Sequence, residues 1–292
     1  MDAVITYVNG LDPVWQADYD KYVGIPREEK RFRDWGTLKY LLRGIATCMP
    51  FIENVFLVVS SESQVPEWAD SGNLKTVLHR DIIPENLLPV FNSCTIEMFL
   101  HRIPGLAEEF IYFNDDMFPL SPCESTDFFV DGRGAMGFSL SLFAGNMYKK
   151  QCRVSSDMAR KALGLGPSPF YVRPQHICSP MLRSSCEAAY AALEEEILAT
   201  ASRTRTPDNP NQYLYLDYMY YSGRAIRRRI SNKHLSQAVY SGEQIAGYIV
   251  RPSSSLACIN DVTMPDDKFT AMKRQILEGF EKAFPNKSRF EK

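Results

Sequence analysis

The sequence predicts an α/β fold with a mainly parallel sheet, helices on both faces and a helical C-terminal part. Short apolar runs rich in β-branched residues alternate with amphipathic helical segments over the first 118 residues. Such alternation is typical of parallel strands joined by crossover helices. Beyond Leu182, most of the periodic segments are helical. We therefore expect a Rossmann-like sheet with helices appended after it.

The first half of the chain contains the strands. Each is a run of four to seven mostly apolar residues that ends abruptly in polar residues, as buried strands of a parallel sheet do. The expected strands are Asp2–Val8, Asn54–Ser60, Leu74–His79 and Phe110–Phe113.

Two helices are expected between these strands. Apolar residues recur at i, i+3, i+4 and i+7 between Gly36 and Met49, and Pro50 ends the pattern. Asp34 precedes this helix, which we expect to begin near Trp35, and its carboxylate is of the type that caps a helix. Ser93 is a candidate N-cap of a shorter helix that reaches residue 100.

The chain divides into three expected parts of one compact catalytic domain. Residues 1–130 form a nucleotide-sugar-binding α/β part. Residues 131–172 are expected to be a mobile loop region, because Asp131–Lys150 is rich in Gly, Ser and Phe without a clear period. Residues 173–292 form a helical part that completes the active site. Its helices are expected at Leu182–Ala201, Gln212–Ser222 (where a strand is the alternative) and Lys268–Phe284.

Composition excludes some classes of protein. The chain has 33 Lys and Arg against 35 Asp and Glu, so its formal net charge is −2, and a nucleic-acid binder normally has a basic excess. We see no apolar run of about 18 residues and no signal peptide, so we expect no membrane span. The seven cysteines form no C-x-x-C pair, which argues against a zinc site, and their odd number, without a signal peptide, favours reduced thiols in a cytoplasm.

Polar clusters follow two of the expected strands. Asn9-Gly10-Leu11-Asp12 follows the first strand, and Asn114-Asp115-Asp116 follows Phe110–Phe113. Ligands bind beyond the carboxyl ends of parallel strands, and a pair of carboxylates there suits Mg²⁺ held together with phosphate oxygens. Asn and Asp also favour turns, so a purely structural role is equally compatible with the spacing.

Two further groups have side chains suited to phosphate chemistry. Arg31 and Arg33 precede the first long helix and can bind phosphate in a fork, although a solvated face explains them as well. His176 lies in Arg173-Pro174-Gln175-His176, a proline-bounded loop, which makes it a candidate general acid or base. A structural role for this histidine remains the alternative.

Four ordered blocks of sequence resemble one known family. They are DAVITYVNGLDPVW from Asp2, then RFRDWGTLKYLLRGI with LPVFNSCTIEMFLHRIPGLAEEFIYFNDDMF up to Phe118, RPQHICSPML continuing to Tyr221, and ACINDVTMPDD with FPNKSRFE up to Glu291. Together they resemble the Stealth family of hexose-1-phosphate transferases. That family includes bacterial capsular polysaccharide phosphotransferases and the animal lysosomal-enzyme GlcNAc-1-phosphotransferase. Trp35 and Gly36 depart from its pattern, as does Ser179 near the place of a second histidine.

The resemblance implies roles for individual residues. Asp34, His176 and Arg205 match catalytic positions. Asn260 and Asp261 match an Asn-Asp pair that resembles a metal or diphosphate contact, and we group them with Asp115 and Asp116 as metal ligands. The residues assigned to substrate binding are Asn9, Asp12, Arg31, Arg33, Asn92 and Arg102.

The resemblance also implies a reaction. A nucleoside diphosphate sugar such as UDP-GlcNAc would be attacked at the phosphorus next to the sugar by a carbohydrate hydroxyl. Nucleoside monophosphate would leave, and a phosphodiester would form in a capsular polysaccharide. Mg²⁺ or Mn²⁺ and Arg205 would balance charge, because phosphoryl transfer depends on charge neutralisation and in-line placement. His176 would accept the hydroxyl proton or donate to the phosphate, and the sequence does not decide whether it or Asp34 is the base.

Two alternatives remain at this point. One is a metal-dependent glycosyltransferase that releases UDP, and the other is a carbohydrate- or nucleotide-binding subunit without turnover. The expected partners are the nucleotide-sugar donor, a polysaccharide or oligosaccharide acceptor and other capsule enzymes. The expected location is the bacterial cytoplasm, peripheral to the inner membrane.

Overall fold

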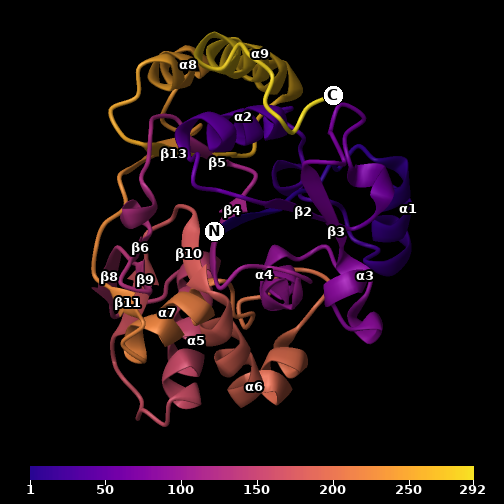
Figure 1. Ribbon diagram of the computed structural model, residues 1–292. Coiled ribbons are helices and arrows are strands. Elements are labelled where there is room, and N and C mark those ends of the chain that lie inside the picture. Colours follow the sequence, from indigo (N-terminus) through magenta and orange to yellow (C-terminus); the bar gives the residue numbers. More distant parts are fainter.

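A five-stranded sheet forms the centre of the fold, in the order β10-β4-β1-β2-β3 (Figure 1). The computed structural model describes residues 1–292 except for the side chain of Glu29. Strands β1 to β4 are parallel, and β10 pairs with β4 in the antiparallel sense at the edge. The strands are β1 Asp2–Thr6, β2 Val55–Val59, β3 Leu74–Leu78, β4 Glu109–Asn114 and β10 Ser179–Leu182. The mainly parallel α/β sheet predicted from the sequence is confirmed.

Helices cover both faces of this sheet. Alternate strand residues point to opposite faces, so Ala3 and Ile5 pack with helices α2 (Leu38–Cys48) and α9 (Asp266–Ala283). Val4 packs on the other face, where α6 (Arg183–Thr200) and α7 (Tyr213–Tyr221) lie. Figure 1 shows α2, α8 and α9 on one side of the sheet and α5, α6 and α7 on the other. All residues of β2 are buried, as expected for a parallel strand covered on both faces.

The starts of two helices differ from the sequence prediction. Helix α2 begins at Leu38, after Thr37, and the Asp34 carboxylate instead accepts a hydrogen bond from the backbone of Gly36 at 2.8 Å. Gly36 has a φ of +68°, which interrupts helical geometry after Asp34, so Asp34 does not cap the helix. Helix α4 covers only Ser93–Glu97, and its N-cap is Asn92, not Ser93.

The segment 131–172 is not a loop region, which corrects the prediction. It contains β7 (Arg133–Ala135), β8 (Phe138–Ser141), helix α5 (Met147–Ala162) and β9 (Tyr171–Pro174). The side chain of Asn146 caps α5. The buried residues of α5 are small or polar, namely Gln151, Cys152, Ser155, Ser156 and Ala159. The helix is amphipathic, but its buried face consists of small and polar residues and the segment is polar on average, so it lacks the large apolar residues that mark a buried helix.

The three long C-terminal helices were predicted to within two residues at each end, and α7 is helical, not a strand. The part after residue 173 also contains strands, because β12 and β13 form a small sheet with β5. All seven cysteines are buried free thiols. None of the helices in the described chain has the length and apolarity needed to span a membrane.

The remaining elements are short. The helices are α1 Pro13–Tyr22, α3 His79–Ile82 and α8 Gly242–Val250, and the strands are β5 Met117–Pro119, β6 Phe129–Val130, β11 Ala225–Ile226, β12 Asn232–Ser236 and β13 Leu256–Asn260. Single-turn 3-10 helices lie at Glu29–Arg31, Glu62–Gln64, Glu85–Leu87, Leu100–Arg102 and Ser125–Asp127.

Candidate active site

A cavity of about 860 Å³ opens at the carboxyl ends of the central strands. Strands β1 and β4 are parallel neighbours with Thr6 beside Asn114, so residues that follow the two strands meet at one edge of the sheet. The predicted site residues that line this cavity are Arg31, Arg33, Asp34, Asp115, Asp116, His176, Arg205, Asn260 and Asp261.

Asp115 and Asp116 occupy the turn between β4 and β5. Burial raises the pKa of Asp115 to about 8, and the carboxylates of Asp116 and Asp34 act in the same direction. Asp116 accepts a hydrogen bond from the Cys258 thiol at 3.4 Å through Oδ2. Its Oδ1 is buried and has no hydrogen-bond partner among the described residues. A concentration of negative charge of this kind requires a cation or a proton nearby.

Asp261 reaches the same cavity from the end of β13. This strand is held beside the Asp115–Asp116 turn, because the backbone of Ile259 donates to the carbonyl of Asp116 at 2.9 Å. Asp261 accepts from the indole of Trp35 at 3.1 Å through Oδ2, while its Oδ1 is buried without a partner in the described structure. Buried carboxylate oxygens normally have a partner, so Asp116 and Asp261 each have an oxygen suited to a hard divalent cation.

Asp34 lies next to these carboxylates. Burial raises the pKa of Tyr7 well above its usual range, and the carboxylates of Asp34 and Asp115 act in the same direction, Asp34 also by hydrogen bonding. The carbonyl of Asp34 accepts from Lys273 of α9 at 2.6 Å, which holds its loop against the C-terminal helix. The Asp34 side chain therefore lies in the cavity, on a loop that Lys273 holds against α9.

His176 projects into the cavity from the connection between β9 and β10. Its Nδ1 lies 3.0 Å from the hydroxyl of Tyr213, and the Tyr148 ring meets it edge-on at a centroid distance of 5.9 Å. Ligand atoms of His176, Asp116 and Cys258 all lie within 4.8 Å of one another. A carboxylate, an imidazole and a thiol form a softer ligand set than the oxygen-only group expected from the sequence.

The arginines form a basic rim around the acidic centre. Arg205 contacts the hydroxyl of Ser93, and Arg31 donates to Glu28 at 2.6 Å. The hydrogen bond from Arg31 is the largest influence that lowers the pKa of Glu28, and Arg205 contributes as well, so the two guanidinium groups share one neighbourhood. Arg33 donates to the carbonyl of Met264 at 3.2 Å. The rim places Arg31 and Arg205 where phosphate oxygens could be bound in bidentate fashion.

Four predicted substrate-binding residues lie outside the described lining of the cavity. Asp12 caps α1 and accepts from Ser63 and Gln64, while Asn9 pairs with Gln64 through its backbone. Asn92 is 1% exposed and bonds to Asn209 at 3.0 Å. The guanidinium of Arg102 lies over the ring of Tyr190 at 4.6 Å. Direct contact with a substrate in this cavity is therefore not expected of Asn9, Asp12, Asn92 or Arg102.

Several residues of the cavity were not predicted. Tyr213, the first residue of α7, and Glu97, the last residue of α4, line the cavity, while Cys258 of β13 does not line it but donates to Asp116, which does. Burial raises the pKa of Glu97 to about 7, although the backbone of Gln212 donates to it at 2.8 Å and Arg205 opposes the rise. A local signal existed only for Cys258, which lies two residues before Asn260.

Comparisons with known proteins show similarity to polysaccharide phosphotransferases. Residues 31–136 match the family described as Stealth protein CR2, conserved region 2. The chain is 31% identical to the receptor polysaccharide phosphotransferase WefC of Streptococcus oralis, over 100% of this chain and 99% of the relative. It is 30% identical to the capsular polysaccharide phosphotransferase WcwK of Streptococcus pneumoniae, with the same coverage.

Other similarities are weaker. A capsular polysaccharide phosphotransferase of Actinobacillus pleuropneumoniae is 29% identical over 77% of this chain and 67% of its own length. Among solved structures, an active-site mutant of LgtC aligns with a TM-score of 0.43 at 11% identity, covering 93% of this chain and 95% of the other.

Proposed function

The chain belongs to the Stealth family of polysaccharide phosphotransferases, and from this premise we propose that it moves a sugar-1-phosphate from a nucleoside diphosphate sugar to a carbohydrate hydroxyl. The broader role, sugar-phosphate transfer in capsular polysaccharide synthesis, follows from its relatives. Beyond this broader role, we propose which donor is used, which bond breaks and which products form.

One observation carries the proposal: a single cavity contains a carboxylate centre, a histidine and a basic rim. Asp34, His176 and Arg205, which are far apart in the chain, all line it. Phosphoryl transfer needs charge neutralisation and alignment more than covalent help from the protein. A site with opposite charges around an 860 Å³ space suits a nucleotide sugar and part of an acceptor.

The proposed reaction is a displacement at the phosphorus that bears the sugar. The acceptor oxygen forms a bond to this phosphorus, and its proton passes to a base, for which Asp34 and His176 are the candidates. The bond from the same phosphorus to the bridging oxygen breaks, and that oxygen leaves with the nucleoside monophosphate. Arg205 would bind the non-bridging oxygens, whose charge is spread in the transition state.

A divalent cation fits the residues present. The buried Oδ1 atoms of Asp116 and Asp261 have no hydrogen-bond partners in the described structure, and Asp115 and Asn260 lie beside them. We propose these four residues as the group that holds Mg²⁺ or Mn²⁺. When bound, the ion would neutralise the diphosphate and so favour departure of the nucleotide.

The released nucleotide tests the reaction. Purified protein is incubated with UDP-GlcNAc or another nucleoside diphosphate sugar and an oligosaccharide acceptor, and the products are separated by ion exchange. Nucleoside monophosphate together with a phosphodiester-linked sugar is the expected result. Release of UDP would place the protein with metal-dependent glycosyltransferases, and binding without turnover would make it a carbohydrate-binding subunit. Full turnover in excess EDTA would remove the metal from the proposal.

We also propose where the reaction takes place and with which partners. The capsular relatives are bacterial, so we place the protein in the cytoplasm, peripheral to the inner membrane, beside other capsule enzymes. Fractionation of cells that produce the full chain, with and without a high-salt wash, tests this location.

A further inference from the structure

We propose that Tyr148 and Tyr213 are positioning residues that hold the proton of neutral His176 on Nε2. His176 then acts as a hydrogen-bond donor toward the transferred phosphate, and Asp34 remains as the base for the acceptor hydroxyl. The assignment of the ring proton stands on geometry alone, whereas its catalytic consequence rests on the proposed function.

The two tyrosines and the histidine form one hydrogen-bonded chain. The hydroxyl of Tyr148, in the first turn of α5, donates to the hydroxyl oxygen of Tyr213 at 3.3 Å. The Tyr213 oxygen lies 3.0 Å from Nδ1 of His176. The chain thus runs from α5, through the first residue of α7, to the loop between β9 and β10.

The direction of this chain follows from counting protons. A tyrosine hydroxyl has a single proton, whereas its oxygen can accept from more than one donor. The Tyr213 oxygen already accepts from Tyr148, so its own proton needs a different acceptor. Nδ1 of His176 is the acceptor that the described structure offers within hydrogen-bond distance. If Tyr213 donates to Nδ1, the proton of the neutral imidazole lies on Nε2.

The opposite arrangement conflicts with the direction of the hydrogen bond from Tyr148. If Nδ1 carried the proton and donated to Tyr213, the Tyr213 oxygen would accept twice, and its own proton would have to be donated to Tyr148, against the direction of that hydrogen bond. Tyr213 is 0% exposed, so water cannot accept this proton instead. An unsatisfied buried donor is strongly disfavoured, which selects the first arrangement.

Fixing the proton on Nε2 narrows the chemistry of His176. With Nδ1 occupied and Nε2 protonated, the neutral ring has no free lone pair and cannot remove a proton from the acceptor. It can donate from Nε2 to a non-bridging phosphate oxygen, where charge develops in the transition state. Of the two candidate bases, Asp34 is then the one whose carboxylate oxygens can still accept a proton in the cavity.

Other titratable groups surround the ring, but none of them forms a hydrogen bond with Nδ1 in the described structure. Asp116 comes from the turn between β4 and β5, Cys258 from β13 and His234 from β12, whose ring centroid is 6.1 Å from that of His176. Asp116, Cys258 and His234 can each gain or lose a proton. The tautomer of His176 must therefore be measured at a pH where its own ring is neutral.

Nitrogen NMR of the full-length protein tests the tautomer without any substrate. Protein labelled with ¹⁵N-histidine is examined by long-range proton–nitrogen correlation at alkaline pH, and His176 is assigned by the signals that His176→Ala removes. In the wild type, Nδ1 is expected at the resonance position of an unprotonated nitrogen and Nε2 at that of a protonated one. A protonated Nδ1 in the neutral ring would overturn the proposal.

Two tyrosine variants complete the test. Tyr213→Phe removes only the oxygen bonded to Nδ1, so His176 should shift toward a mixture of tautomers, and kcat should fall about 10-fold or more with a smaller change in KM. Tyr221→Phe is the matched control, because Tyr221 lies on the same helix and its hydroxyl bonds to Ser156 at 3.0 Å. It should leave the His176 resonances and the rate unchanged. Identical His176 spectra in wild type and Tyr213→Phe would contradict the proposal.

The two readouts separate this inference from the proposed function. If the tautomer is as proposed but UDP is the released nucleotide, the tyrosine chain stands and the reaction class changes. If nucleoside monophosphate is released and Nδ1 is protonated, the reaction stands and the tyrosine chain is rejected.

Discussion

His176 and Arg205 reach the cavity from connecting segments, so removing either side chain should affect turnover more than folding. Neither contributes to the hydrophobic core, and truncation leaves no large buried cavity. We expect His176→Ala and Arg205→Ala each to reduce kcat by about 10²-fold or more, because each loses a transition-state contact. Product formation and thermal unfolding would be measured together. Near-normal rates in both variants would reject these assignments while leaving the reaction itself intact.

Asp217 is a carboxyl buried between helices, and we expect it to make stability depend on pH. It is 0% exposed, and neither oxygen makes a hydrogen bond of ordinary geometry in the described structure, although the Ser156 hydroxyl lies near. Burial raises the pKa of Asp217 well above its usual range, and Ser156 only partly opposes this. The folded state therefore binds this proton more tightly than the unfolded state does.

The sign of the pH dependence follows from that difference. As pH rises above about 4, the unfolded chain releases the proton first, so stability should fall by about 1.4 kcal/mol per pH unit until the folded pKa is reached. Asp217→Asn should lack this contribution and gain stability over the wild type as the pH rises from 4 to 8. Urea unfolding at several pH values measures it. Parallel curves for the two proteins would show that Asp217 does not carry the effect.

The residues that could be predicted are those whose neighbours in sequence reveal their position. Asp115 and Asp116 directly follow an apolar strand, and that order along the chain is enough to place them at the carboxyl edge of the sheet. The proline-bounded loop already marked His176 as a candidate acid or base, whereas Arg205 entered through the family resemblance. Tyr213 could not be found in either way, because it lies in an apolar segment where packing alone explains it fully, and Cys258 was marked only by its place two residues before Asn260.

At the scale of elements, the approach of α2 to β5 depends on Gly44. A Cβ at this position would lie 2.5 Å from the carbonyl oxygen of Pro119, which belongs to the backbone and cannot move aside easily. Gly44→Ala gains about 1 kcal/mol in helix propensity but should lose about 1–3 kcal/mol through the clash. We expect net destabilisation in urea unfolding.

Gly247 in α8 is the matched control for this substitution. It is an exposed helical glycine, and a Cβ there would meet nothing within 4 Å. Gly247→Ala should therefore stabilise the protein by about 0.5–1 kcal/mol. Equal effects of the two substitutions would mean that α2 can shift away from β5 without cost.

Helix α5 explains why one element escaped sequence prediction. Its segment packs against α7 through Cys152, Ser155 and other small or polar residues, whereas α2 buries Leu41, Leu42 and Ile45. Both helices are amphipathic, but only α2 has large apolar residues on its buried face, so a search for apolar stripes finds α2 and overlooks α5. Small residues allow close helix packing without an apolar stripe, so the contact is visible only when both helices are placed.

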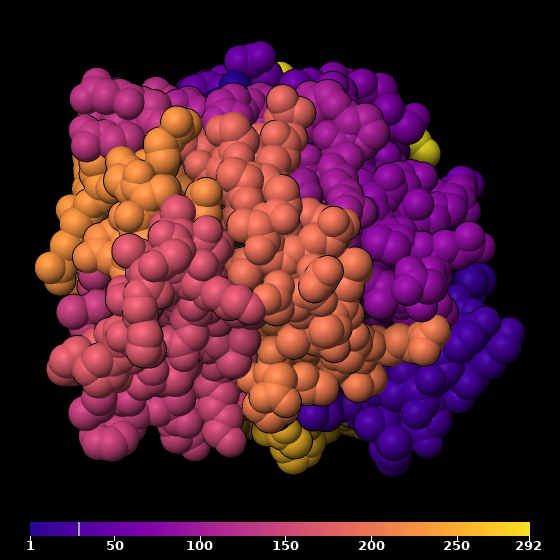
Figure 2. Space-filling view, turned by 90° about the horizontal axis from the view of Figure 1, so that it is seen from below, coloured from indigo at the N-terminus to yellow at the C-terminus, as the bar shows by residue number. Residues whose placement is uncertain are grey.

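At the scale of the whole molecule, the cavity exists because segments distant in sequence are fixed at one edge of the sheet. Segment 131–172 and the helices after it form a continuous face in Figure 2, adjacent to the parts from the first half of the chain. On the opposite side of the sheet, α9 holds the Asp34 loop through Lys273, and β13 brings Asp261 beside the Asp115–Asp116 turn. The positions of the catalytic candidates therefore depend on how the C-terminal part is anchored.

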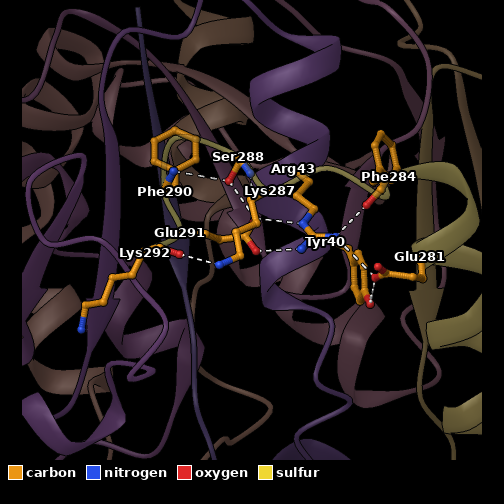
Figure 3. A network of polar contacts seen from close by, with 9 residues as sticks. All are labelled: Tyr40, Arg43, Glu281, Phe284, Lys287, Ser288, Phe290, Glu291 and Lys292. Atoms are coloured by element: carbon orange, nitrogen blue, oxygen red, sulfur yellow. Dashed lines mark hydrogen bonds and ion pairs between the residues drawn. The ribbon is translucent and has the colours of Figure 1, made fainter.

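That anchor is an ion pair in the interior (Figure 3). Arg43 of α2 donates to both carboxylate oxygens of Glu291, at 2.9 and 2.8 Å, and to the carbonyl of Phe284 at 2.7 Å. The side chains of Arg43 and Glu291 are only 7% and 5% exposed. Phe290, next to Glu291, is 1% exposed and extends the anchor with an apolar contact. Removing Glu291 should therefore leave the buried charge of Arg43 only partly compensated, by the half-exposed carboxylate of Glu281.

We expect Glu291→Gln to lower the free energy of unfolding by about 3–5 kcal/mol, because the buried Arg43 guanidinium would lose its bidentate counter-ion and keep only the half-exposed Glu281 carboxylate, 3.4 Å away. Glu278→Gln is the control: Glu278 pairs with Arg274 at the surface, where the two side chains are 61% and 73% exposed, so its loss should cost at most about 0.5 kcal/mol.

Replacing both members of the buried pair, as in Arg43→Met with Glu291→Leu, should recover much of the loss, since no unpaired charge remains. Urea unfolding of the four proteins at pH 7 measures these differences. A Glu291→Gln loss no larger than that of Glu278→Gln would mean that water or the Glu281 carboxylate, 3.4 Å from Arg43, can replace Glu291.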